Sequence, residues 1–449
     1  MLYDGLHKGR IAAAAATDNW EELRVKGRAI KWHTIRNLDY YLELLEERVV
    51  ANGGKVYFAN DDAEASEYVM GVARANDVKT VIKSKSMVSE EMGLNEAFEE
   101  AGIRPVETDL GEYIIQLANE PPYHLIAPAI HKTREEISDL IQQAAGGPRE
   151  EDPKDLTKTA RRLLREEFRT AEMGVSGVNF AVAETGSIAL VTNEGNGRMV
   201  TSAPRVHVAI MGMEKVIPSM QDLSTMLRIL IRSATGQRIS SYVTIVNGPR
   251  KAPEEDGPDE FHLVIVNNGR ENLLKDPQLR EALLCIRCGA CLNACPVYRK
   301  AGGHAYGWVY PGPIGAVITP VMSGKKRAKD LPFASTLCGA CREVCPVSID
   351  LPTLLLRLRS DLAEGKAAPG ERSSVLMERL SFKIWRFGML HASAFGLGGR
   401  IASAGMWPIS RRGWLRRLPP PFSGWTSSRD FPRIAFRPFR SRFRSRGGG

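Results

Sequence analysis

Apolar residues recur at helical spacing through the first fifty residues of the chain. They lie three or four positions apart, or at multiples of that spacing, which places them on one face of a helix: Trp20, Leu23, Ile30, Ile35, Leu38, Tyr41, Leu42 and Leu45. The turn-forming segment Asn52-Gly53-Gly54 ends the pattern. The sequence therefore predicts an N-terminal helical region over residues 1–50.

Short apolar runs then alternate with amphipathic stretches. The runs predict strands, and the stretches between them predict helices over Asp61–Ala75 and Ser89–Ala101. Asp61 or Asp62 caps the first of these helices, because a side-chain carboxylate accepts hydrogen bonds from the free N–H groups of the first turn. An alternating strand–helix order predicts a largely parallel sheet covered by helices. The strands are expected at Lys55–Ala59, Lys79–Lys83, Ile103–Glu107 and His124–Ala127.

More strands are expected after a helix over Leu156–Glu172. Two of them flank Glu184-Thr185-Gly186, which predicts a hairpin. An α/β domain is therefore expected over residues 51–268. The strands of this second half are expected at Val178–Ala183, Ser187–Thr192, Val206–Met211, Ser241–Val246 and Phe261–Val266.

The C-terminal part is different in character. Residues 270–365 predict short helices around the cysteines, and residues 370–410 predict helices with an apolar face that we interpret as a partner surface rather than a membrane surface. Residues 411–449 are rich in Pro, Arg and Gly and predict a disordered basic tail. The apolar face carries Leu376, Leu380, Ile384, Trp385 and Leu390.

The charge is concentrated in that tail. The chain has a net charge of +9, but residues 411–449 hold 11 Arg and one acid, so the rest of the chain stands at −1. Such a tail attracts anionic lipid or nucleic acid, although a solvated terminus is the preferred interpretation and nucleic acid is not an expected partner. The sequence shows neither an apolar run of about 18 residues nor a signal-peptide pattern. We expect a cytoplasmic protein, with contact at the periphery of a membrane left open.

All seven cysteines lie between Cys285 and Cys345. Such clustering argues for metal binding in a reducing compartment rather than for disulfides. The first run is Cys285-x2-Cys288-x2-Cys291-x3-Cys295-Pro296, the bacterial ferredoxin pattern, in which the fourth cysteine binds the other cluster. Zinc sites use paired C-x2-C units with wider gaps, so zinc is the disfavoured alternative.

The second run, Cys338-x2-Cys341-x3-Cys345-Pro346, has Ser335 where a leading cysteine would stand. By the crossed rule, Cys285, Cys288, Cys291 and Cys345 bind one [4Fe–4S] cluster. Three thiolates remain for a second cluster: Cys295, Cys338 and Cys341. That cluster is a [3Fe–4S] cluster, a [4Fe–4S] cluster with one non-cysteine iron, or one bound by Ser335; a serine alkoxide is a poor ligand for a soft metal site and ranks last.

Together these residues resemble the lactate utilization protein B family. The resemblance implies a NagB/RpiA/CoA-transferase-like α/β domain followed by an α-helical ferredoxin domain. It also implies a role in oxidising L-lactate to pyruvate with two partner subunits. Besides the cysteine runs, the matching segments are Lys83-Ser84-Lys85-Ser86-Met87, Glu107–Tyr113, His131-Lys132-Thr133-Arg134, Glu184-Thr185-Gly186-Ser187, Gly302-Gly303-His304 and Tyr310-Pro311-Gly312-Pro313.

Several other residues are candidates for a site. Lys83, Lys85 and Ser86 lie in a loop after a strand, where α/β sheets bind ligands, and the two lysines could hold a carboxylate or phosphate. Glu184 lies in a tight turn, as does a catalytic glutamate of the CoA transferases that the chain resembles. His131 and His304 are candidate proton carriers or substrate contacts. No dinucleotide fingerprint is present, so NAD is not expected.

The function expected from the sequence is electron transfer within an L-lactate-oxidising complex. Catalysis itself would lie on a partner subunit, because this chain does not supply a base, a hydride acceptor and an anion clamp together. Two alternatives are a redox-sensing iron–sulfur protein without enzymatic activity, and an α/β enzyme on a CoA or phosphate ester with structural clusters.

Overall fold

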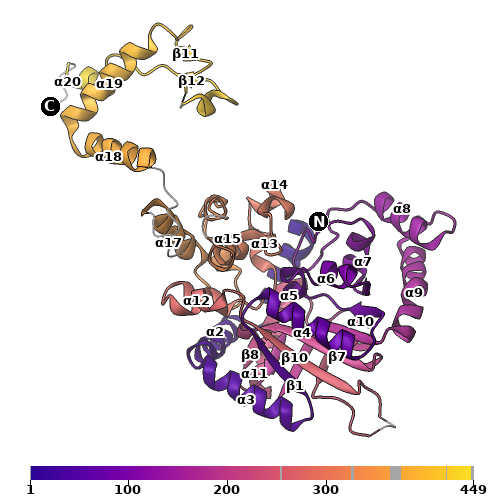
Figure 1. The fold of residues 1–449 in the computed structure, drawn as a ribbon. Helices are drawn as coiled ribbons and strands as arrows, with labels where there is room; N and C mark the ends of the chain where they lie inside the picture. The colour runs from indigo at the N-terminus through magenta and orange to yellow at the C-terminus, as the bar shows by residue number, and fades with distance from the viewer. Residues whose placement is uncertain (1, 253–254, 325–327, 365–375, 421, 446–449) are drawn as a thin grey trace. The chain divides into compact units, whose positions relative to one another are not determined.

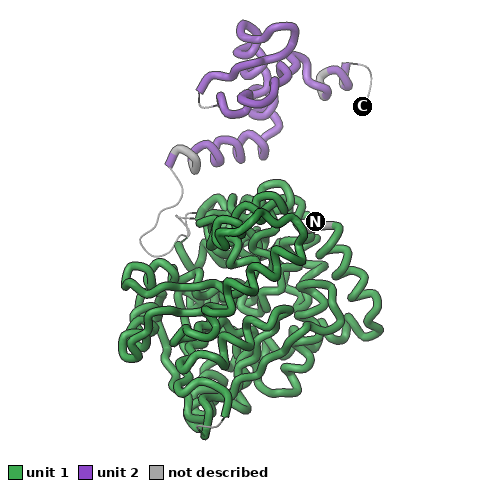
Figure 2. Tube along the Cα trace, turned by 90° about the vertical axis from the view of Figure 1, so that its right-hand side faces the viewer, with its two compact units in different colours: residues 1–362, 366–371 green, residues 363–365, 372–449 purple. Residues whose placement is uncertain are grey.

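The computed structural model describes residues 2–252, 255–324, 328–364, 376–420 and 422–445. The chain forms two compact units, residues 1–362 with 366–371 and residues 363–365 with 372–449, which Figure 2 distinguishes by colour. The first unit contains the large sheet and all seven cysteines.

The predicted N-terminal helical region is confirmed. It consists of a π-helical turn, Leu2–His7, and the helices α1 (Lys8–Ala15), α2 (Trp20–Arg36) and α3 (Leu38–Ala51). The apolar positions of the sequence pattern face the core, with Ile35 and Leu45 almost fully buried.

Six parallel strands form the central sheet of the first unit (Figure 1). Every neighbouring pair is parallel, as the strand–helix alternation predicted. The narrower assignment to a NagB/RpiA/CoA-transferase-like fold stays a prediction. In spatial order the strands are β1 (Lys55–Ala59), β10 (Glu260–Val266), β7 (Val206–Gly212), β4 (Met173–Gly177), β2 (Thr80–Lys83) and β3 (Arg104–Glu107).

Helices α4 (Asp62–Ala75), α5 (Met87–Glu91) and α6 (Leu94–Glu100) cover one face of this sheet. Asp61 is the cap of α4, since its side chain accepts a 2.9 Å hydrogen bond from the backbone N–H of Glu64. The single helix predicted over Ser89–Ala101 is wrong. Gly93 has a left-handed φ of 61°, which ends α5 and starts α6.

The strand predicted at His124–Ala127 is also wrong. The backbone N–H groups of Ile126 and Ala127 donate to His124 Nδ1 at 3.0 and 3.1 Å, so these two donors are used locally and do not pair with a strand. This segment instead connects α7 (Leu110–Leu117) to α8 (Arg134–Ala145) as a loop. Helix α9 (Pro153–Thr170) then leads back to the sheet.

A smaller sheet has the order β8–β5–β6–β9, made of Val216–Ile217, Phe180–Val182, Ser187–Thr192 and Tyr242–Val246. Strands β5 and β6 pair antiparallel around Glu184-Thr185-Gly186, which confirms the predicted hairpin. Helices α10 (Asn196–Ser202) and α11 (Met220–Thr235) flank this region, and a 3₁₀ turn, Met213–Lys215, joins β7 to β8.

The cysteine segment is built from short helices, and its described residues between 270 and 364 contain no strand. It shares one apolar core with α2, α3 and the smaller sheet. In order, its elements are α12 (Arg270–Lys275), η3 (Leu279–Leu284), α13 (Ala290–Ala294), α14 (Tyr298–Ala301), η4 (His304–Tyr306), α15 (Gly312–Met322), η5 (Leu331–Phe333), α16 (Ala340–Glu343) and α17 (Leu351–Glu364).

The second unit has almost no core. Among its described residues only Ser403 and Leu415 are buried. Where disorder was predicted, the described residues of 411–445 contain short elements: β11 (Trp414–Leu415), η6 (Ser423–Thr426), β12 (Phe431–Pro432) and α20 (Phe439–Arg444). Ser403 donates a 2.8 Å hydrogen bond to the carbonyl of Ile434. Helices α18 (Leu376–Leu390) and α19 (Ala392–Met406) precede them. Within the described ranges, no helix is long and apolar enough to cross a membrane.

Candidate functional site

The first cysteine run is a tight loop held by two left-handed residues. Arg287 has a φ of 59° and Gly289 a φ of 73°, and α13 begins directly afterwards. This geometry turns the backbone N–H of Arg287 toward Cys285 Sγ, to which it donates at 3.4 Å. The two-residue spacers therefore fold into a loop that directs backbone donors at sulfur.

The second run repeats this geometry. Leu337 has a φ of 54° and Gly339 a φ of 85°, and α16 follows. The backbone N–H of Leu337 donates to Ser335 Oγ at 3.1 Å. Ser335 thus occupies the local position that Cys285 occupies in the first run.

Four thiols line one small cavity, and they come from both runs. Cys285, Cys288 and Cys291 approach from the first loop, and Cys345 reaches the cavity from the end of the second. All four are free cysteines, as are the other three. The remaining lining is mostly apolar, with Leu125 and Ile314 among it, and it includes one charged side chain, Arg287. This is the group of four that the crossed ligand rule predicts.

Of the other three cysteines, Cys341 interacts with both Cys295 and Cys338. Burial, together with the neighbouring Cys295 and Cys338, raises the pKa of Cys341 to about 12. Cys338 is exposed, and the backbone N–H of Ala340 lowers the pKa of its thiol. Cys295 is therefore close to the second run although it belongs to the first sequence motif.

The buried thiols need a cation to ionise. Burial, with the neighbouring thiols adding to it, raises the pKa of Cys288 to about 12 and that of Cys345 to about 11, and it also raises the pKa of Cys291. Iron coordination supplies the positive charge that stabilises thiolates. Four free thiols around one apolar cavity are the donor set that a cubane cluster requires, so the residues fit the group.

A buried charged network lies beside this cavity. Arg270 forms a bidentate pair with Glu91, at 2.8 Å for each bond, and its Nε donates to Glu214 Oε2 at 2.8 Å. Arg287 Nη2 donates to Glu214 Oε1 at 3.2 Å. Burial opposes the ionisation of Glu214, but Arg270 and Arg287 outweigh it and lower its pKa to about 2. Tyr310 adds a 2.7 Å hydrogen bond to Glu91.

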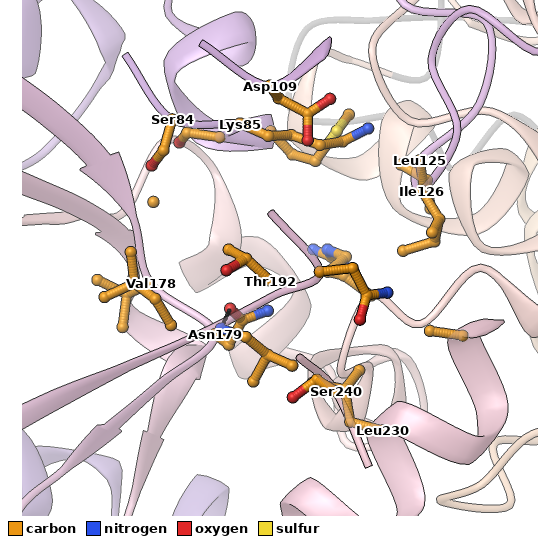
Figure 3. A pocket seen from close by; sticks show the side chains of 18 of the residues that line it. Ser84, Lys85, Asp109, Leu125, Ile126, Val178, Asn179, Thr192, Leu230 and Ser240 are labelled. Atoms are coloured by element: carbon orange, nitrogen blue, oxygen red, sulfur yellow. Dashed lines mark hydrogen bonds between the residues drawn. The ribbon is translucent and has the colours of Figure 1, made fainter. Parts of the chain in front are cut away.

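A larger cavity, of about 490 Å³, lies at the carboxyl ends of four neighbouring parallel strands, where α/β sheets bind ligands. Figure 3 shows Ser84, Lys85 and Asp109 on one side of it, with Asn179 and Thr192 facing them. Leu125, Ile126, Val178 and Leu230 give it apolar walls. Arg287 and Leu125 line this cavity and the four-thiol cavity, so the two are neighbours.

The three residues predicted to form a ligand-binding loop, Lys83, Lys85 and Ser86, lie in different environments. Lys85 and Ser86 line the larger cavity, whereas Lys83 does not. Lys83 is fully buried, and its Nζ donates to Glu107 at 2.6 Å and to Asn95 at 2.5 Å. Burial alone would lower the pKa of Lys83, but Glu107 and Glu90 raise it. Its contacts are those of a structural ion pair.

The ammonium group of Lys85 can still donate hydrogen bonds. Its Nζ lies 3.2 Å from Glu112 Oε1, yet neither atom has a hydrogen bond of good geometry among the described residues. Burial raises the pKa of Glu112 to about 8, against the opposing effect of Lys85. Ser86 is the cap of α5, since its Oγ accepts from the backbone N–H of Ser89 at 3.2 Å.

Glu184 is exposed and lies outside both cavities. Its carboxylate accepts a 3.0 Å hydrogen bond from the backbone N–H of Met220, the first residue of α11. This contact favours a structural role at the helix start.

His131 and His304 come together although 173 positions separate them in the sequence. Their ring centroids are 5.0 Å apart, and one ligand atom from each, with one from Glu120, falls within 4.8 Å of the others. His131 Nε2 is hydrogen-bonded to Glu120 Oε2 at 2.8 Å, and Tyr123 stacks on the His131 ring. This cluster lines neither cavity.

The polar residues that line the larger cavity and that sequence reasoning missed include Lys215, Asn196 and Arg287. Lys215 follows an apolar strand, which is the same signal that identified Lys85. Arg287 lies between two cysteines, where the ligand motif drew attention to the sulfur atoms alone. Asn196 belongs to a glycine turn, Gly195-Asn196-Gly197, whose spacing does not match a dinucleotide fingerprint.

Comparison with known protein families divides the chain into three consecutive matches. Residues 42–266 match the LUD domain, residues 281–349 match the 4Fe-4S dicluster domain, and residues 357–448 match the C-terminal domain of lactate utilisation protein B. The third match extends through the Arg-rich tail. The dicluster match supports iron–sulfur binding by the cysteine segment.

Curated relatives match along nearly the whole chain. The proteins called lactate utilization protein B in Bacillus thuringiensis (strain Al Hakam), Bacillus cereus (strain AH187) and Bacillus anthracis (strain A0248) are each 47% identical over 439 residues, which is 98% of this chain and 90% of each relative. A solved DUF162 family protein from Deinococcus radiodurans covers 51% of this chain and 98% of its own, at 12% identity and a TM-score of 0.29. From its three domains and its full-length relatives, the chain belongs to the lactate utilization protein B family.

Proposed function

We propose that the protein is the iron–sulfur electron-transfer subunit of a system that oxidises L-lactate to pyruvate and acts with two partner subunits. The observation that carries this proposal is the crossed arrangement of cysteines, with Cys345 joining Cys285, Cys288 and Cys291 around one cavity. The names of the full-length relatives support lactate as the substrate of the system.

We assign Cys285, Cys288, Cys291 and Cys345 to a [4Fe–4S] cluster, and Cys295, Cys338 and Cys341 to a second cluster with three thiolates. When bound, such clusters accept and release single electrons. Lactate oxidation releases two electrons, so a pair of clusters can carry both away from the partner that performs the chemistry. The chain's own contribution is to hold the clusters, to shield the first one with apolar residues and to place the guanidinium of Arg287 beside it.

The second cluster is proposed to be a [3Fe–4S] cluster or a [4Fe–4S] cluster with one iron that has no cysteine ligand. Ser335 Oγ stands in the position equivalent to Cys285 Sγ. Because a neutral hydroxyl is a weak ligand for iron in a sulfur cluster, this position favours loss or exchange of one iron.

The test is anaerobic reconstitution followed by iron analysis, EPR and addition of L-lactate. Seven to eight irons per chain are expected, with two distinguishable cluster signals. L-lactate is expected to bleach the cluster absorbance only when the partner subunits are present. Stoichiometric zinc without a cluster signal would refute the iron–sulfur assignment, and clusters that lactate never reduces would refute the role in lactate oxidation.

We also propose a cytoplasmic location with the second unit as the docking surface. Its apolar side chains are exposed, including Trp385 at 61% and Trp407 at 64%. Residues 376–449 contain 15 Lys and Arg against two acids. This chemistry suits an acidic partner subunit or the anionic surface of a membrane.

A further inference from the structure

The N-terminal helices lie against the segment that carries Cys345. Arg24 of α2 donates from Nε and Nη2 to the carbonyl oxygen of Cys345, at 3.1 and 2.9 Å. One turn later, Arg28 donates to the carbonyl oxygen of Ser348 at 2.7 Å. The π-helical turn Leu2–His7 packs against α13 of the first cysteine run. The N-terminal region therefore helps to hold the one cysteine that the second run contributes to the four-thiol cavity.

Arg10 of α1 is a buried cation that forms no ion pair or hydrogen bond with the described residues. It is 7% exposed, and its Nε is buried without a partner in that part of the chain. Its Cζ lies 5.6 Å from the centroid of the Trp20 ring, a contact that positions the guanidinium without neutralising it. A buried charge without a counter-charge is unfavourable, so the position of Arg10 requires an anion.

Two ligands of the four-thiol cavity interact with this cation. Burial lowers the pKa of Arg10, and the thiolates of Cys288 and Cys345 oppose that effect. A cubane held by four thiolates carries a net charge of about −2, and one electron from the lactate-oxidising partner makes it about −3. The loaded cluster therefore supplies the anion that Arg10 requires.

Arg10 differs in this respect from the other cations of the site. Arg287 is paired with Glu214 at 3.2 Å, and Arg24 is paired with Glu21 at 2.8 Å. In those two pairs a carboxylate compensates most of the positive charge. Arg10 contributes an uncompensated charge, which acts on the cluster at full strength.

We propose that Arg10 is the charge partner of the first cluster and that its guanidinium raises the reduction potential of that cluster. This inference rests on the proposed function, because it concerns the cluster assigned to the four-thiol cavity. A fixed positive charge stabilises the reduced, more negative state more than the oxidised state, so Arg10 favours acceptance of an electron. Residues 1–41 lie outside the three family matches, and this role makes the N-terminal helices part of the cluster site.

The test is a redox titration of the anaerobic, cluster-loaded full-length protein, followed by EPR. The signal of the first cluster is identified in a Cys338→Ser background, in which the second cluster has lost a thiolate. Arg10→Met should lower the midpoint potential of the first cluster by about 59 mV, which is a tenfold change in the ratio of reduced to oxidised cluster for one electron. The midpoint of the second cluster should change less. Arg10→Lys keeps the charge and should retain most of the wild-type potential.

Arg232→Met is the matched control. Arg232 of α11 donates from Nε to Thr17 Oγ1 at 3.0 Å, so it fastens the same N-terminal region. Burial and the neighbouring Arg228 and Arg238, rather than a thiol, determine the direction in which its pKa is lowered. Arg232→Met should therefore keep both midpoint potentials. Equal shifts in Arg10→Met and Arg232→Met would show a general effect of loosened helices and overturn the charge role.

Iron content decides the case in which a variant loses the first cluster. Loss in Arg10→Met but not in Arg10→Lys would show that the site requires the charge, and it would support the proposal. Loss in both variants would show a packing role and overturn it.

Failure of this inference is separable from failure of the proposed function. An unchanged midpoint potential in fully loaded Arg10→Met would overturn the inference and leave the clusters and their function in place. A lowered potential in Arg10→Met, with clusters that lactate never reduces, would keep the inference and remove the role in lactate oxidation. A wild-type protein that loads no four-thiolate cluster would remove both.

Discussion

The backbone N–H of Leu337 donates a 3.1 Å hydrogen bond to Ser335 Oγ, and the left-handed φ of Leu337 makes that contact. The first cysteine run contains the same bond, from Arg287 to Cys285 Sγ. The second loop thus keeps the shape of a cluster-binding loop with an oxygen in place of one sulfur. A change at this position alters the ligand without altering the loop.

We predict that Ser335→Cys converts the second cluster into a four-thiolate [4Fe–4S] cluster. The new sulfur would occupy the position that the loop already shapes, and thiolate is the preferred ligand of such iron. EPR of the oxidised protein should lose its [3Fe–4S] signal. Ser335→Ala is the control and should leave that signal unchanged. Collapse of the second cluster in Ser335→Ala would show instead that the hydroxyl is a ligand.

We predict that Cys285→Ser and Cys338→Ser damage different clusters. The two residues belong to different groups, since Cys285 lines the four-thiol cavity with Cys345 and Cys338 lies with Cys341. EPR of each variant should retain one of the two wild-type signals, and the retained signals should differ. A further variant, Cys295→Ser, should resemble Cys338→Ser. If it resembles Cys285→Ser, the crossed assignment is wrong.

The sequence predicted the fold correctly where a single local rule, such as residue periodicity or ligand spacing, determines the structure. The parallel sheet follows from alternating periods, and the tight loops follow from cysteine spacing together with left-handed positions such as Gly289 and Gly339. The strand expected at His124–Ala127 failed because the ring of His124 binds the backbone donors, a competition that hydrophobic pattern does not register.

In the candidate site, too, local sequence rules predicted some features and missed others. Lys83 and Lys85 are equivalent in sequence, but β2 ends at Lys83, so Lys83 stays in the core while Lys85 lies in the following loop and lines the larger cavity. The presence of both Lys215 and Arg287 in the larger cavity, or the contact of His131 with His304, depends on packing between segments far apart in the chain. Such contacts follow from the tertiary fold and are absent from any local pattern.

We predict that Lys83→Met destabilises the protein by about 3–5 kcal/mol, because it leaves the carboxylate of Glu107 buried without its cation. The bond lost is the 2.6 Å contact from Lys83 Nζ to Glu107. The measurement is anaerobic thermal unfolding. The double variant Lys83→Met, Glu107→Leu should recover part of the loss, since both charges are then removed together. A single variant as stable as the wild type would show that Glu107 becomes neutral at little cost.

We predict that Glu194 makes the protein less stable as the pH rises from about 4.5 to 7. Burial, with Asp109 nearby, raises the pKa of Glu194 from 4.5 to about 7. In that window the folded state holds a proton that the unfolded state has released, so stability falls with rising pH. Discounted for partial exposure, the effect is about 1–2 kcal/mol.

Glu194→Gln should flatten this part of the stability profile. The amide oxygen can still accept the 3.2 Å hydrogen bond from the backbone N–H of Leu110. Denaturation midpoints at pH 5, 6, 7 and 8 provide the measurement, with the exposed Glu166→Gln as a control that should keep the wild-type slope. A profile that stays equally steep in Glu194→Gln would assign the dependence to other groups.

We predict that removal of residues 376–449 leaves both clusters intact but weakens docking. All seven cysteines belong to the first unit, and the second unit forms its own compact body. The cut is placed before α18 because a cut at residue 411 would break the hydrogen bond from Ser403 to Ile434. Iron content and EPR spectra of the truncated protein should match those of the full chain.

The docking loss should depend on salt. The surface carries 15 Lys and Arg against two acids, and such attraction is screened within about 8 Å at physiological ionic strength. The exposed Trp and Phe side chains add an apolar contribution that salt does not screen. Truncation should therefore weaken binding to the partner subunits or to anionic vesicles most at low salt, and a smaller loss should remain at high salt.

Vesicles without anionic lipid distinguish a membrane target from a protein target. Binding that requires neither lipid charge nor low salt points to a protein partner. Truncated and full-length proteins that bind both targets equally would remove the docking role, and loss of iron on truncation would show that the second unit stabilises the cluster-binding segment.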